Sequence, residues 1–494
     1  MLAAAILCSG WGTALWALSG PDKVAWPQFR GPNGSGVAAG EGLPESWSKT
    51  DNLAWSTAIP GRGWSSPVVW GERVFVTSAV QEGDFKEPWT GIYGNQYIAE
   101  LQRQGLPQDE IMRLVRARDS EGPEESKEVR WMVYCLDAAS GRILWEREAH
   151  RGLPFGGRHR KNTYASETPV TDGKRVYAYF GNVGLFAFSV DGEPLWQRKW
   201  APGRIYLDFG TASSPSLHGG RLFVLQDRQE GGFLAAIDAE SGQQVWYRER
   251  SFKHPLIRSG FSTPFVWANS KRTEVVTLGP QILISYDLQG NELWRQQGQS
   301  LVAAPTPVAL GDMLFAGSGS PSEPVRPLYA VRAGAWGDIS LAKKEEKNEF
   351  VAWSQSRGGS YITSPIVYRD RVYVLYDKGF LAAFDTKTGD QVFKARFERG
   401  GHAFSSSPWA YQGKIFCLSE EGVTFVLEAG DEYKLLGKND LEEMSLATPA
   451  IAQGSLFIRT ATRLYRIEEG GEVSRRGAEA RREGREGREG REGK

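Results

Sequence analysis

Ser65–Val69 reads SSPVV, a run of small residues followed by proline, and the same pattern returns seven times along the chain. The other copies are SETPV at Ser166, SSPSL at Ser213, STPFV at Ser262, PTPVA at Pro305, TSPIV at Thr363, SSPWA at Ser406 and ATPAI at Ala447. Successive prolines are 102, 46, 49, 43, 58, 43 and 41 residues apart, so the unit has a little over 40 residues, with insertions in the first and fifth copies. Such a period is typical of the four-stranded blades of β-propellers.

Each unit continues with three more β-like segments. A turn such as GERV or RDRV leads into an alternating run, a second run ends in D-x-x-S/T-G, and a last run carries a large aromatic residue. Period-2 alternation between turns rich in Gly and Asp predicts one four-stranded antiparallel sheet per unit. The proline is expected on the innermost strand, an edge that needs no ladder donor. The aromatic residues should fill the space between diverging outer strands: Trp145, Trp196, Trp246, Trp294, Trp353 and Phe393.

The two ends of the repeat region complement each other. The eighth unit starts at Ala447 and has no outer strand, whereas Leu53–Ile59, which carries Trp55, precedes the first unit. A strand from the N-terminal side that completes the last blade would leave no open edge. The sequence therefore predicts an all-β fold: an eight-bladed β-propeller of four-stranded antiparallel blades over residues 20–470, closed by an N-terminal strand.

Four segments lie outside the repeat. Residues 1–19 are apolar and predict a signal peptide, with an uncleaved N-terminal anchor as the alternative. The Gly- and Pro-rich residues 26–36 (WPQFRGPNGSG) are expected to cross the ring as a loop. An insertion at about 82–128 in blade 1 has helical spacing over residues 96–105 and 107–119. The low-complexity residues 471–494 contain repeated REG triplets and predict a disordered tail.

Composition limits the function classes. The formal net charge is zero, which argues against nucleic acid as a partner. Beyond the leader, Cys135 and Cys417 both lie in apolar strand-like runs and are expected to be buried thiols, although a disulfide between them is the open alternative. The leader predicts a periplasmic or secreted protein, associated with the membrane only if the N-terminus stays uncleaved. We expect a monomer.

Two stretches, CLDAASGRILW at Cys135–Trp145 and AIDAESGQQVW at Ala236–Trp246, resemble the repeat of quinoprotein alcohol dehydrogenases and of the bacterial outer-membrane assembly propeller. The segments WPQFRGPNGSG and NTYASETPVTDGKRVYAY are similar to the pyrroloquinoline-quinone (PQQ)-binding-like repeat proteins of environmental bacteria. The resemblance covers roughly residues 26–470 and implies the fold more than an activity. Quinoprotein dehydrogenases hold PQQ and Ca²⁺ over the axis, and many carry two adjacent disulfide-bonded cysteines, which are absent from this sequence.

The loops that enter the inner strands should converge on one mouth of the channel. Their charged and aromatic residues are the candidate ligand-binding set: Arg62, Trp64, Arg158, His159, Lys161, Asn162, Tyr164, Glu167, Asp208, Arg258, Tyr361 and His402. Arg and Lys side chains could hold the carboxylates of an anion such as PQQ, and Trp64 or Tyr361 could stack on a planar ring. Glu167, Asn162 and Asp208 form a set suited to a hard cation such as calcium, and Asp208 is the candidate general base. The alternative is that these groups satisfy one another and bind nothing.

Two functions follow from these patterns. The first is an exported, non-catalytic binding or scaffold propeller whose ligand, a protein, glycan or small molecule, binds at the channel mouth or through the insertion. The second is a PQQ- and calcium-dependent quinoprotein dehydrogenase of alcohols or sugars. The missing cysteine pair favours the first.

Overall fold

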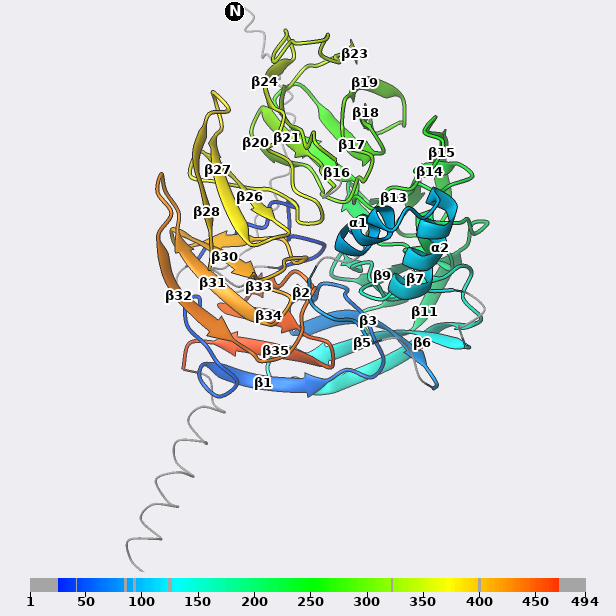
Figure 1. The fold of residues 1–494 in the computed structure, drawn as a ribbon. Coiled ribbons are helices and arrows are strands. Elements are labelled where there is room, and N and C mark those ends of the chain that lie inside the picture. Colours follow the sequence, from blue (N-terminus) through cyan, green and yellow to red (C-terminus); the bar gives the residue numbers. More distant parts are fainter. Residues whose placement is uncertain are drawn as a thin grey trace, which may run out of the picture.

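The computed structural model describes residues 25–40, 42–83, 87–91, 95–122, 127–320, 323–398 and 401–470. Eight antiparallel sheets of four strands lie around a central axis as the blades of a propeller, and the fourth blade carries an additional short strand (Figure 1). The predicted eight-bladed propeller is therefore confirmed. The N-terminal leader and the C-terminal tail lie outside the described residues, so their assignments stay predictions.

The chain runs from the inner to the outer strand in each of the first seven blades. Blades 1 to 4 comprise, in this order, β2 (Val68–Trp70), β3 (Arg73–Gln81), β5 (Val129–Asp137) and β6 (Ile143–Gly152); β8 (Val170–Thr171), β9 (Arg175–Phe180), β10 (Gly184–Ser189) and β11 (Pro194–Arg198); β12 (Ser216–His218), β13 (Arg221–Gln226), β14 (Gly232–Asp238) and β15 (Gln244–Arg250); β16 (Phe265–Ala268), β17 (Thr273–Gly279), β18 (Ile282–Tyr286), β19 (Glu292–Gln297) and the added β23 (Gly337–Asp338). Blades 5 to 8 comprise β20 (Val308–Leu310), β21 (Met313–Gly317), β22 (Leu328–Arg332) and β24 (Val351–Gln355); β25 (Ile366–Tyr368), β26 (Arg371–Tyr376), β27 (Phe380–Asp385) and β28 (Gln391–Arg396); β29 (Trp409–Tyr411), β30 (Lys414–Leu418), β31 (Val423–Glu428) and β32 (Leu435–Asp440); β33 (Ala450–Ala452), β34 (Ser455–Arg459), β35 (Arg463–Glu468) and β1 (Leu53–Ala58).

The last blade closes the ring with a strand from the other end of the chain. Strand β1 pairs antiparallel with β35, with Ser56 opposite Tyr465 and Ala58 opposite Arg463. This is the predicted N-terminal closure. It gives the eighth blade its fourth strand, so that the outer edge of β35 is paired.

The residue before each anchor proline is Ser or Thr, and hydrogen bonds between these residues link neighbouring blades. The backbone N–H of this residue donates to the hydroxyl of its counterpart in the following blade, from Ser66 to Thr168 at 3.0 Å through to Ser407 to Thr448 at 3.0 Å. Five more such bonds link the positions between them. We call these eight residues the hydroxyl belt: Ser66, Thr168, Ser214, Thr263, Thr306, Ser364, Ser407 and Thr448. All eight are buried around the channel.

The aromatic residues of the outer strands also join neighbouring blades, as expected for wedge residues. The indole Nε1 of Trp145 donates to Val190 O at 2.9 Å, and Trp246 donates to Leu288 O at 2.9 Å. Both acceptors lie in the turn between the third and fourth strands of the next blade. The turn glycine faces the same indole, because a Cβ on Gly242 would lie 2.5 Å from the ring of Trp196.

Trp294 departs from this pattern. It is fully buried and donates to Glu274 Oε2 at 2.7 Å within its own blade. The reason is the insertion in the fifth unit, which adds β23 in parallel beside β19 and so covers the outer edge of blade 4.

Residues 26–38 cross the channel, as the sequence predicted for this segment, and we call them the plug. Trp26 bridges Val69 in blade 1, Gln28 accepts from Leu217 N in blade 3, and Ala38 donates to Ala410 O in blade 7. Each of these partners comes a few residues after the belt residue of its blade, towards the far end of the inner strand. The plug therefore closes the mouth of the channel opposite to the one formed by the loops that enter the inner strands. The chain then passes under blade 7, where Trp47 N donates to Asn439 Oδ1 at 3.0 Å, before it reaches β1.

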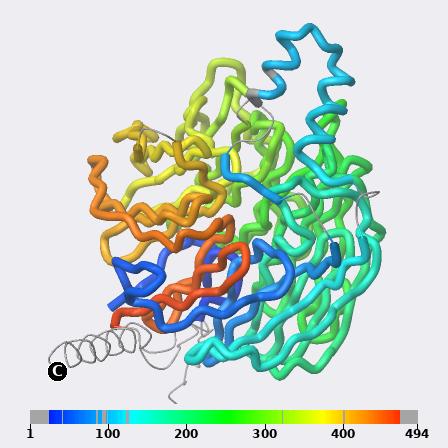
Figure 2. Tube along the Cα trace, turned by 60° about the horizontal axis from the view of Figure 1, so that its bottom comes forward, coloured from blue at the N-terminus to red at the C-terminus, as the bar shows by residue number. Residues whose placement is uncertain are grey.

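The blade 1 insertion carries two helices, α1 (Asn95–Arg103) and α2 (Gln108–Asp119), which project from one face of the ring (Figure 2). They share a small apolar core of Leu101, Ile111 and Val115. A short sheet of β4 (Ser120–Glu121) and β7 (Arg158–His159) fixes the end of the insertion to the loop that enters blade 2. Within the described residues no helix is long and apolar enough to cross a membrane.

The two cysteines are unpaired and buried, in β5 and β30. Burial raises the pKa of the Cys135 thiol to about 12. These are buried thiols in blades 1 and 7, which are not neighbours in the ring, and the disulfide alternative is wrong.

Candidate functional site at the channel mouth

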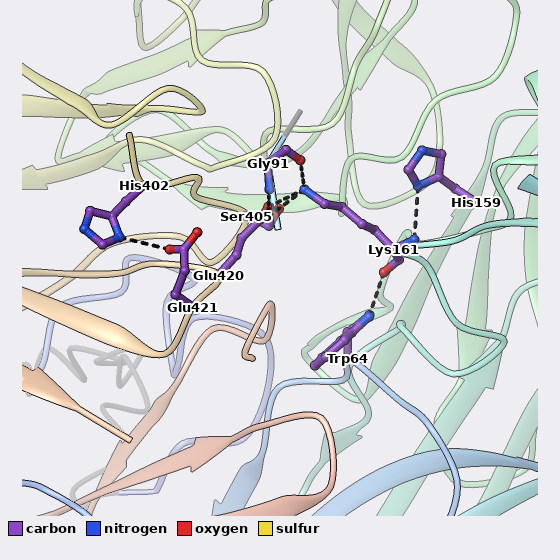
Figure 3. A network of polar contacts seen from close by, with 8 residues as sticks. All are labelled: Trp64, Gly91, His159, Lys161, His402, Ser405, Glu420 and Glu421. Atoms are coloured by element: carbon purple, nitrogen blue, oxygen red, sulfur yellow. Dashed lines mark hydrogen bonds and ion pairs between the residues drawn. The ribbon is translucent and has the colours of Figure 1, made fainter. Parts of the chain in front are cut away.

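A buried ion pair spans the mouth formed by the loops that enter the inner strands. Lys161 comes from the loop before blade 2, and Glu420 follows β30 in blade 7 (Figure 3). Lys161 Nζ lies 2.6 Å and 2.7 Å from the two carboxylate oxygens of Glu420, and the side chains are 11% and 2% exposed. Ser405 Oγ also donates to Glu420 at 2.6 Å. The pair thus joins blades that are not neighbours in the ring.

The insertion contacts both members of this ion pair. Gly91 N donates to Glu420 Oε2 at 2.9 Å, and Gly91 O accepts from Lys161 Nζ. Residues 87–91, which we call the strap, have two further attachments: Arg62 pairs with Glu87, and the guanidinium of Arg160 lies over the ring of Trp89 at 4.1 Å. The strap therefore lies across the mouth and is held by residues of three blades.

A second buried ion pair attaches the end of the insertion. Arg158 and Glu121 lie 2.7 Å apart, with side chains 4% and 5% exposed. Arg158 Nη1 also donates to Asn162 O at 3.0 Å. Tyr164 lies nearby, with its ring 6.0 Å from the Arg158 guanidinium, and its hydroxyl donates to Gly156 O at 3.3 Å. Arg158, predicted to hold an anionic ligand, is thus engaged by a carboxylate of the chain itself.

Asp208, the candidate general base, is in contact with helix α2. It lies at the end of a 3₁₀ turn, Tyr206–Asp208, in which Leu207 and Asp208 both have left-handed backbone angles, with φ of 51° and 54°. Its carboxylate forms an ion pair with Arg116 and accepts from Gly157 N at 3.4 Å. The Arg116 guanidinium therefore engages the carboxylate that the sequence offers as a general base.

Asn162 and Glu167 have separate partners in blade 2 and blade 3. The Asn162 amide donates to Phe209 O at 2.7 Å and Thr211 O at 3.0 Å, and its oxygen accepts from Thr163 N and Ser166 Oγ. Glu167 is fully buried and accepts from Gly181 N at 3.2 Å. Burial raises the pKa of Glu167 to about 7. The amide is therefore fully used for loop structure, whereas Glu167 Oε2 is buried and has no hydrogen-bond partner among the described residues.

These contacts bear on the predicted cation site. Asn162 and Asp208 each use their side-chain groups for contacts within the protein. None of these contacts brings either side chain together with Glu167. In the part of the chain that the structure describes, no group of three or more His, Cys, Asp or Glu side chains could hold a metal ion. The Asn162 amide and the Asp208 carboxylate are thus engaged by groups of the protein, and the calcium set of Glu167, Asn162 and Asp208 stays a prediction.

The other predicted residues lie around the same mouth. Trp64 Nε1 donates to Lys161 O at 2.7 Å (Figure 3), so its indole supports the ion pair. His159 stands edge-on to Phe209 at 5.0 Å, and burial together with the charge of Lys161 lowers the pKa of His159 to about 3. His402 Nδ1 lies 3.1 Å from Glu421 Oε2. Arg258 N donates to Gln229 Oε1 at 2.8 Å.

Tyr361 belongs to a second polar group, within blades 5 and 6. Burial, reinforced by the charge of Asp377, raises the pKa of Tyr361 to about 12. Asp377 is itself buried, and among the described residues neither carboxylate oxygen has a hydrogen-bond partner. Its closest cation is Arg326, with Nη1 at 3.8 Å, and burial raises the pKa of Asp377.

Glu420 and Asp377 lie outside the loops that enter the inner strands, where the candidate residues were sought. Asp377 and Asp227 directly follow the second strand of a blade, and Glu420 is the second residue after it. Asp227 forms a buried ion pair with Arg250 at 2.7 Å. In an up-and-down blade, the turn after the second strand lies on the same face as the loop before the first. An acidic residue at this position in three units was the available signal.

Comparison with known proteins assigns the family. The family model described as outer membrane protein assembly factor BamB matches residues 129–326 and 266–475, which together span more than two thirds of the chain. No curated protein sequence matches. Among solved structures, the fold is similar to the quinohemoprotein alcohol dehydrogenase of Comamonas testosteroni (TM-score 0.55, 11% identity, covering 91% of this chain and 81% of that one).

Two further structures are similar. One is a europium-containing methanol dehydrogenase, with a TM-score of 0.55, 10% identity, and coverage of 90% of this chain and 98% of that one. The other is BamB of Moraxella catarrhalis, with a TM-score of 0.48, 15% identity, and coverage of 69% and 89%. With the family match over most of its repeats, the chain belongs to the PQQ-like repeat β-propellers of the BamB family.

Proposed function

We propose that this chain is a non-catalytic binding protein of the cell envelope that docks a partner protein on the face bearing the strap and the helical insertion. The supporting observation is that the strap crosses the channel mouth between Lys161 and Glu420, with Gly91 bonded to both. A small molecule would have to displace this contact to reach the axis.

The electrostatics of the mouth support the same proposal. The cationic groups that would receive an anionic cofactor are held by carboxylates of the chain: Arg62 by Glu87, Arg158 by Glu121, Lys161 by Glu420 and Arg116 by Asp208. Breaking a buried pair by withdrawing one partner costs about 3–5 kcal/mol. Only Arg158–Glu121 and Lys161–Glu420 are buried on both sides, so an anion would have to offset this cost at these two pairs, which disfavours a cofactor site at the mouth.

Exposed apolar side chains on the same face suit a protein partner. Trp89 lies on the strap, Leu153 and Phe155 on the loop between β6 and β7, and Leu256 on the loop between β15 and β16. These four side chains are 40–74% exposed. Apolar groups grouped on one face are typical of protein interaction sites.

The family name and the leader suggest where the partner is found. The matching family is described as an outer membrane protein assembly factor, and residues 1–19 have the pattern of an export signal. We therefore propose export to the periplasm or beyond and a partner among envelope proteins.

The test compares two triple variants of the full chain. The first, Trp89→Ser, Leu153→Ser and Phe155→Ser, removes apolar groups from the proposed face. The matched control, Leu195→Ser, Val245→Ser and Leu436→Ser, removes outer-strand groups that are 45–46% exposed. Proteins crosslinked to each variant in the envelope fraction would be quantified by mass spectrometry. We expect recovery of the partner to fall about tenfold or more with the first variant only, in line with the loss of a few anchor residues. Equal recovery with both variants would contradict the proposal.

The alternative is a PQQ- and calcium-dependent dehydrogenase. The observation in its favour is the pair of buried carboxyl groups, Glu167 and Asp377, whose raised pKa values are common at functional sites. Titration of PQQ into the full chain with Ca²⁺, followed by calorimetry, separates the two functions. Saturable heat that is lost in Glu167→Gln would support the dehydrogenase, and no heat over several temperatures would support the binding protein.

A further inference from the structure

Arg30 lies in the plug with its side chain completely buried, at 0% exposure. Its Nη2 donates to Ser35 O at 3.1 Å and to Pro365 O at 2.6 Å. Nε and Nη1 have no hydrogen-bond partner among the described residues. A guanidinium has five N–H groups, so three of them remain unsatisfied by the protein.

No carboxylate among the described residues forms an ion pair with Arg30. Arg250 shows how the same fold treats another buried guanidinium, since Asp227 binds it at 2.7 Å and 3.1 Å and Thr277 and Tyr286 complete its contacts. Burial alone lowers the pKa of Arg30 to about 9, so the group keeps its charge at neutral pH. A buried charge without a counter-charge is strongly unfavourable.

The hydroxyl belt adds donors beside Arg30. Pro365, whose carbonyl accepts from Arg30, follows the belt residue Ser364, and the carbonyl of Pro408, which follows Ser407, lies 3.2 Å from the position of a Cβ on Gly36. A Cβ there would also lie 3.2 Å from Arg30 Nη2, so the guanidinium is packed against the chain that follows both serines. The Ser364 and Ser407 hydroxyls accept from neighbouring blades, and no described residue accepts their protons.

We propose that Arg30, together with the hydroxyls of Ser364 and Ser407, forms a buried site for a small monovalent anion of halide size on the axis of the propeller. The guanidinium and the two hydroxyls are donors, and no carboxylate among the described residues pairs with Arg30, which favours a negative ligand over a cation. Complete burial of Arg30 and the close approach of Gly36 leave no room for a large oxyanion. The site is on the opposite side of the belt from the strap, so it does not depend on the proposed function.

Two further observations support a ligand role for Arg30. Its backbone is left-handed, with φ of 63°, a conformation that residues other than glycine rarely adopt. The plug residues on either side of Arg30, from Gln28 to Gly34, line a cavity of about 110 Å³ against blades 3 to 5, and this cavity reaches the belt residues Thr263 and Thr306. This cavity offers a small ion a way past the plug to the belt.

The first test is crystallographic and uses the unaltered full chain. Crystals grown without halide and soaked in sodium bromide should give an anomalous peak within hydrogen-bonding distance of Arg30 Nε or Nη1 and of a belt hydroxyl. Density without anomalous signal at this point would identify water and overturn the proposal. This test does not require any variant to fold.

The second test measures thermal unfolding in sodium chloride against sodium gluconate at equal ionic strength and pH. A ligand that binds only the folded state raises the midpoint, and at about 100 times its dissociation constant the rise should be about 2–3 °C for a chain of this size. Arg30→Met should lose the difference between the salts, whereas Gln28→Ala, a plug variant away from the guanidinium, should keep it. An unchanged difference in Arg30→Met would overturn the proposal.

Discussion

Trp55 in the N-terminal strand donates from its indole Nε1 to the carbonyl oxygen of Ala138 in the first blade, at 2.9 Å. Its ring also lies against Gly141 of the same turn. Because β1 belongs to the last blade, this contact joins the eighth blade to the first. The D-x-x-S/T-G-x-x-x-W pattern is therefore a contact between blades, in which an outer-strand indole donates to the turn of the next unit, as do those of Trp55, Trp145, Trp196, Trp246 and Trp353.

Loss of the Trp55 hydrogen bond should weaken the ring closure. In Trp55→Phe the buried carbonyl of Ala138 loses one of its two donors and keeps Arg466 Nη1 at 2.8 Å, so we expect the free energy of unfolding to fall by about 0.5–1.5 kcal/mol. Urea denaturation followed by circular dichroism would measure it. Trp336→Phe, at a residue 64% exposed, is the control and should change the value by less than about 0.5 kcal/mol. A Trp55 variant as stable as this control would show that the closure does not depend on the bond.

The turn glycines should be sensitive because of the neighbouring indole as well as their backbone angle. Gly242 and Gly219 both have positive φ, 71° and 56°, but only a Cβ on Gly242 would meet a ring, that of Trp196. Gly219→Ala should cost about 1 kcal/mol for the left-handed backbone. Gly242→Ala should cost a further 1–3 kcal/mol or so, because the indole must move. Equal losses of stability for the two variants in urea denaturation would mean that the Trp196 ring moves aside without a cost in free energy.

The blade count, the closure and the outer aromatic residues could be predicted because a pattern of about forty residues recurs along the chain and shows what each unit contains or lacks. The role of the residue before each proline could not. The sequence shows Ser66 and Thr168 only as small residues before proline, whereas the Thr168 hydroxyl also accepts a hydrogen bond from Ser66 N of the preceding blade. A single sequence shows that Ser or Thr recurs, but the acceptor role depends on the distance between adjacent inner strands, which only the closed ring fixes.

The candidate site was less predictable for a related reason. The sequence placed Lys161 at the mouth but not its partner Glu420, which is 259 residues away in the chain. Nor could it show that the strap, which belongs to the blade 1 insertion, lies between them. Insertions have no repeat partner, so their position on the ring follows from contacts such as Arg116 with Asp208 rather than from periodicity.

The Lys161–Glu420 pair should stabilise the fold and hold the strap. Lys161→Met leaves a buried carboxylate without its cation, and we expect a loss of about 3–5 kcal/mol in the free energy of unfolding. Glu420→Gln should be costly for the same reason, and the double variant should cost less than the sum of the two by about 1–3 kcal/mol. Urea denaturation of all four proteins gives this coupling.

Hydrogen exchange reports the strap itself. Gly91 N donates to Glu420, so its amide should exchange at least about tenfold faster in Glu420→Gln than in the unaltered chain, because an amide acceptor is weaker than a carboxylate. The amide of Arg62, which donates to Ala79 O away from the pair, is the internal control. Unchanged exchange at Gly91 with additive stabilities would show that the strap is held by other contacts.

Glu167 should make the protein less stable as the pH rises. Its pKa is about 7 in the folded protein, against an ordinary value of 4.5, because burial disfavours the carboxylate. Between these two values the folded state binds the proton and the unfolded state releases it, so stability falls as the pH rises through this window. The full loss, reached above pH 7, is about 3 kcal/mol. The neighbouring Tyr179 stays neutral throughout, since burial and the charge of Glu167 raise its pKa.

In Glu167→Gln the titrating group is absent, and the variant should gain about 3 kcal/mol relative to the unaltered chain between pH 4.5 and pH 8. Urea denaturation at several pH values measures the difference, which cancels the contribution of Asp377. Glu292→Gln, at an exposed residue paired with Arg295, is the control and should run parallel to the unaltered chain. Parallel curves for Glu167→Gln as well would mean that this carboxyl is ionised in the folded protein at neutral pH, and a cationic ligand would then have to lie beside it.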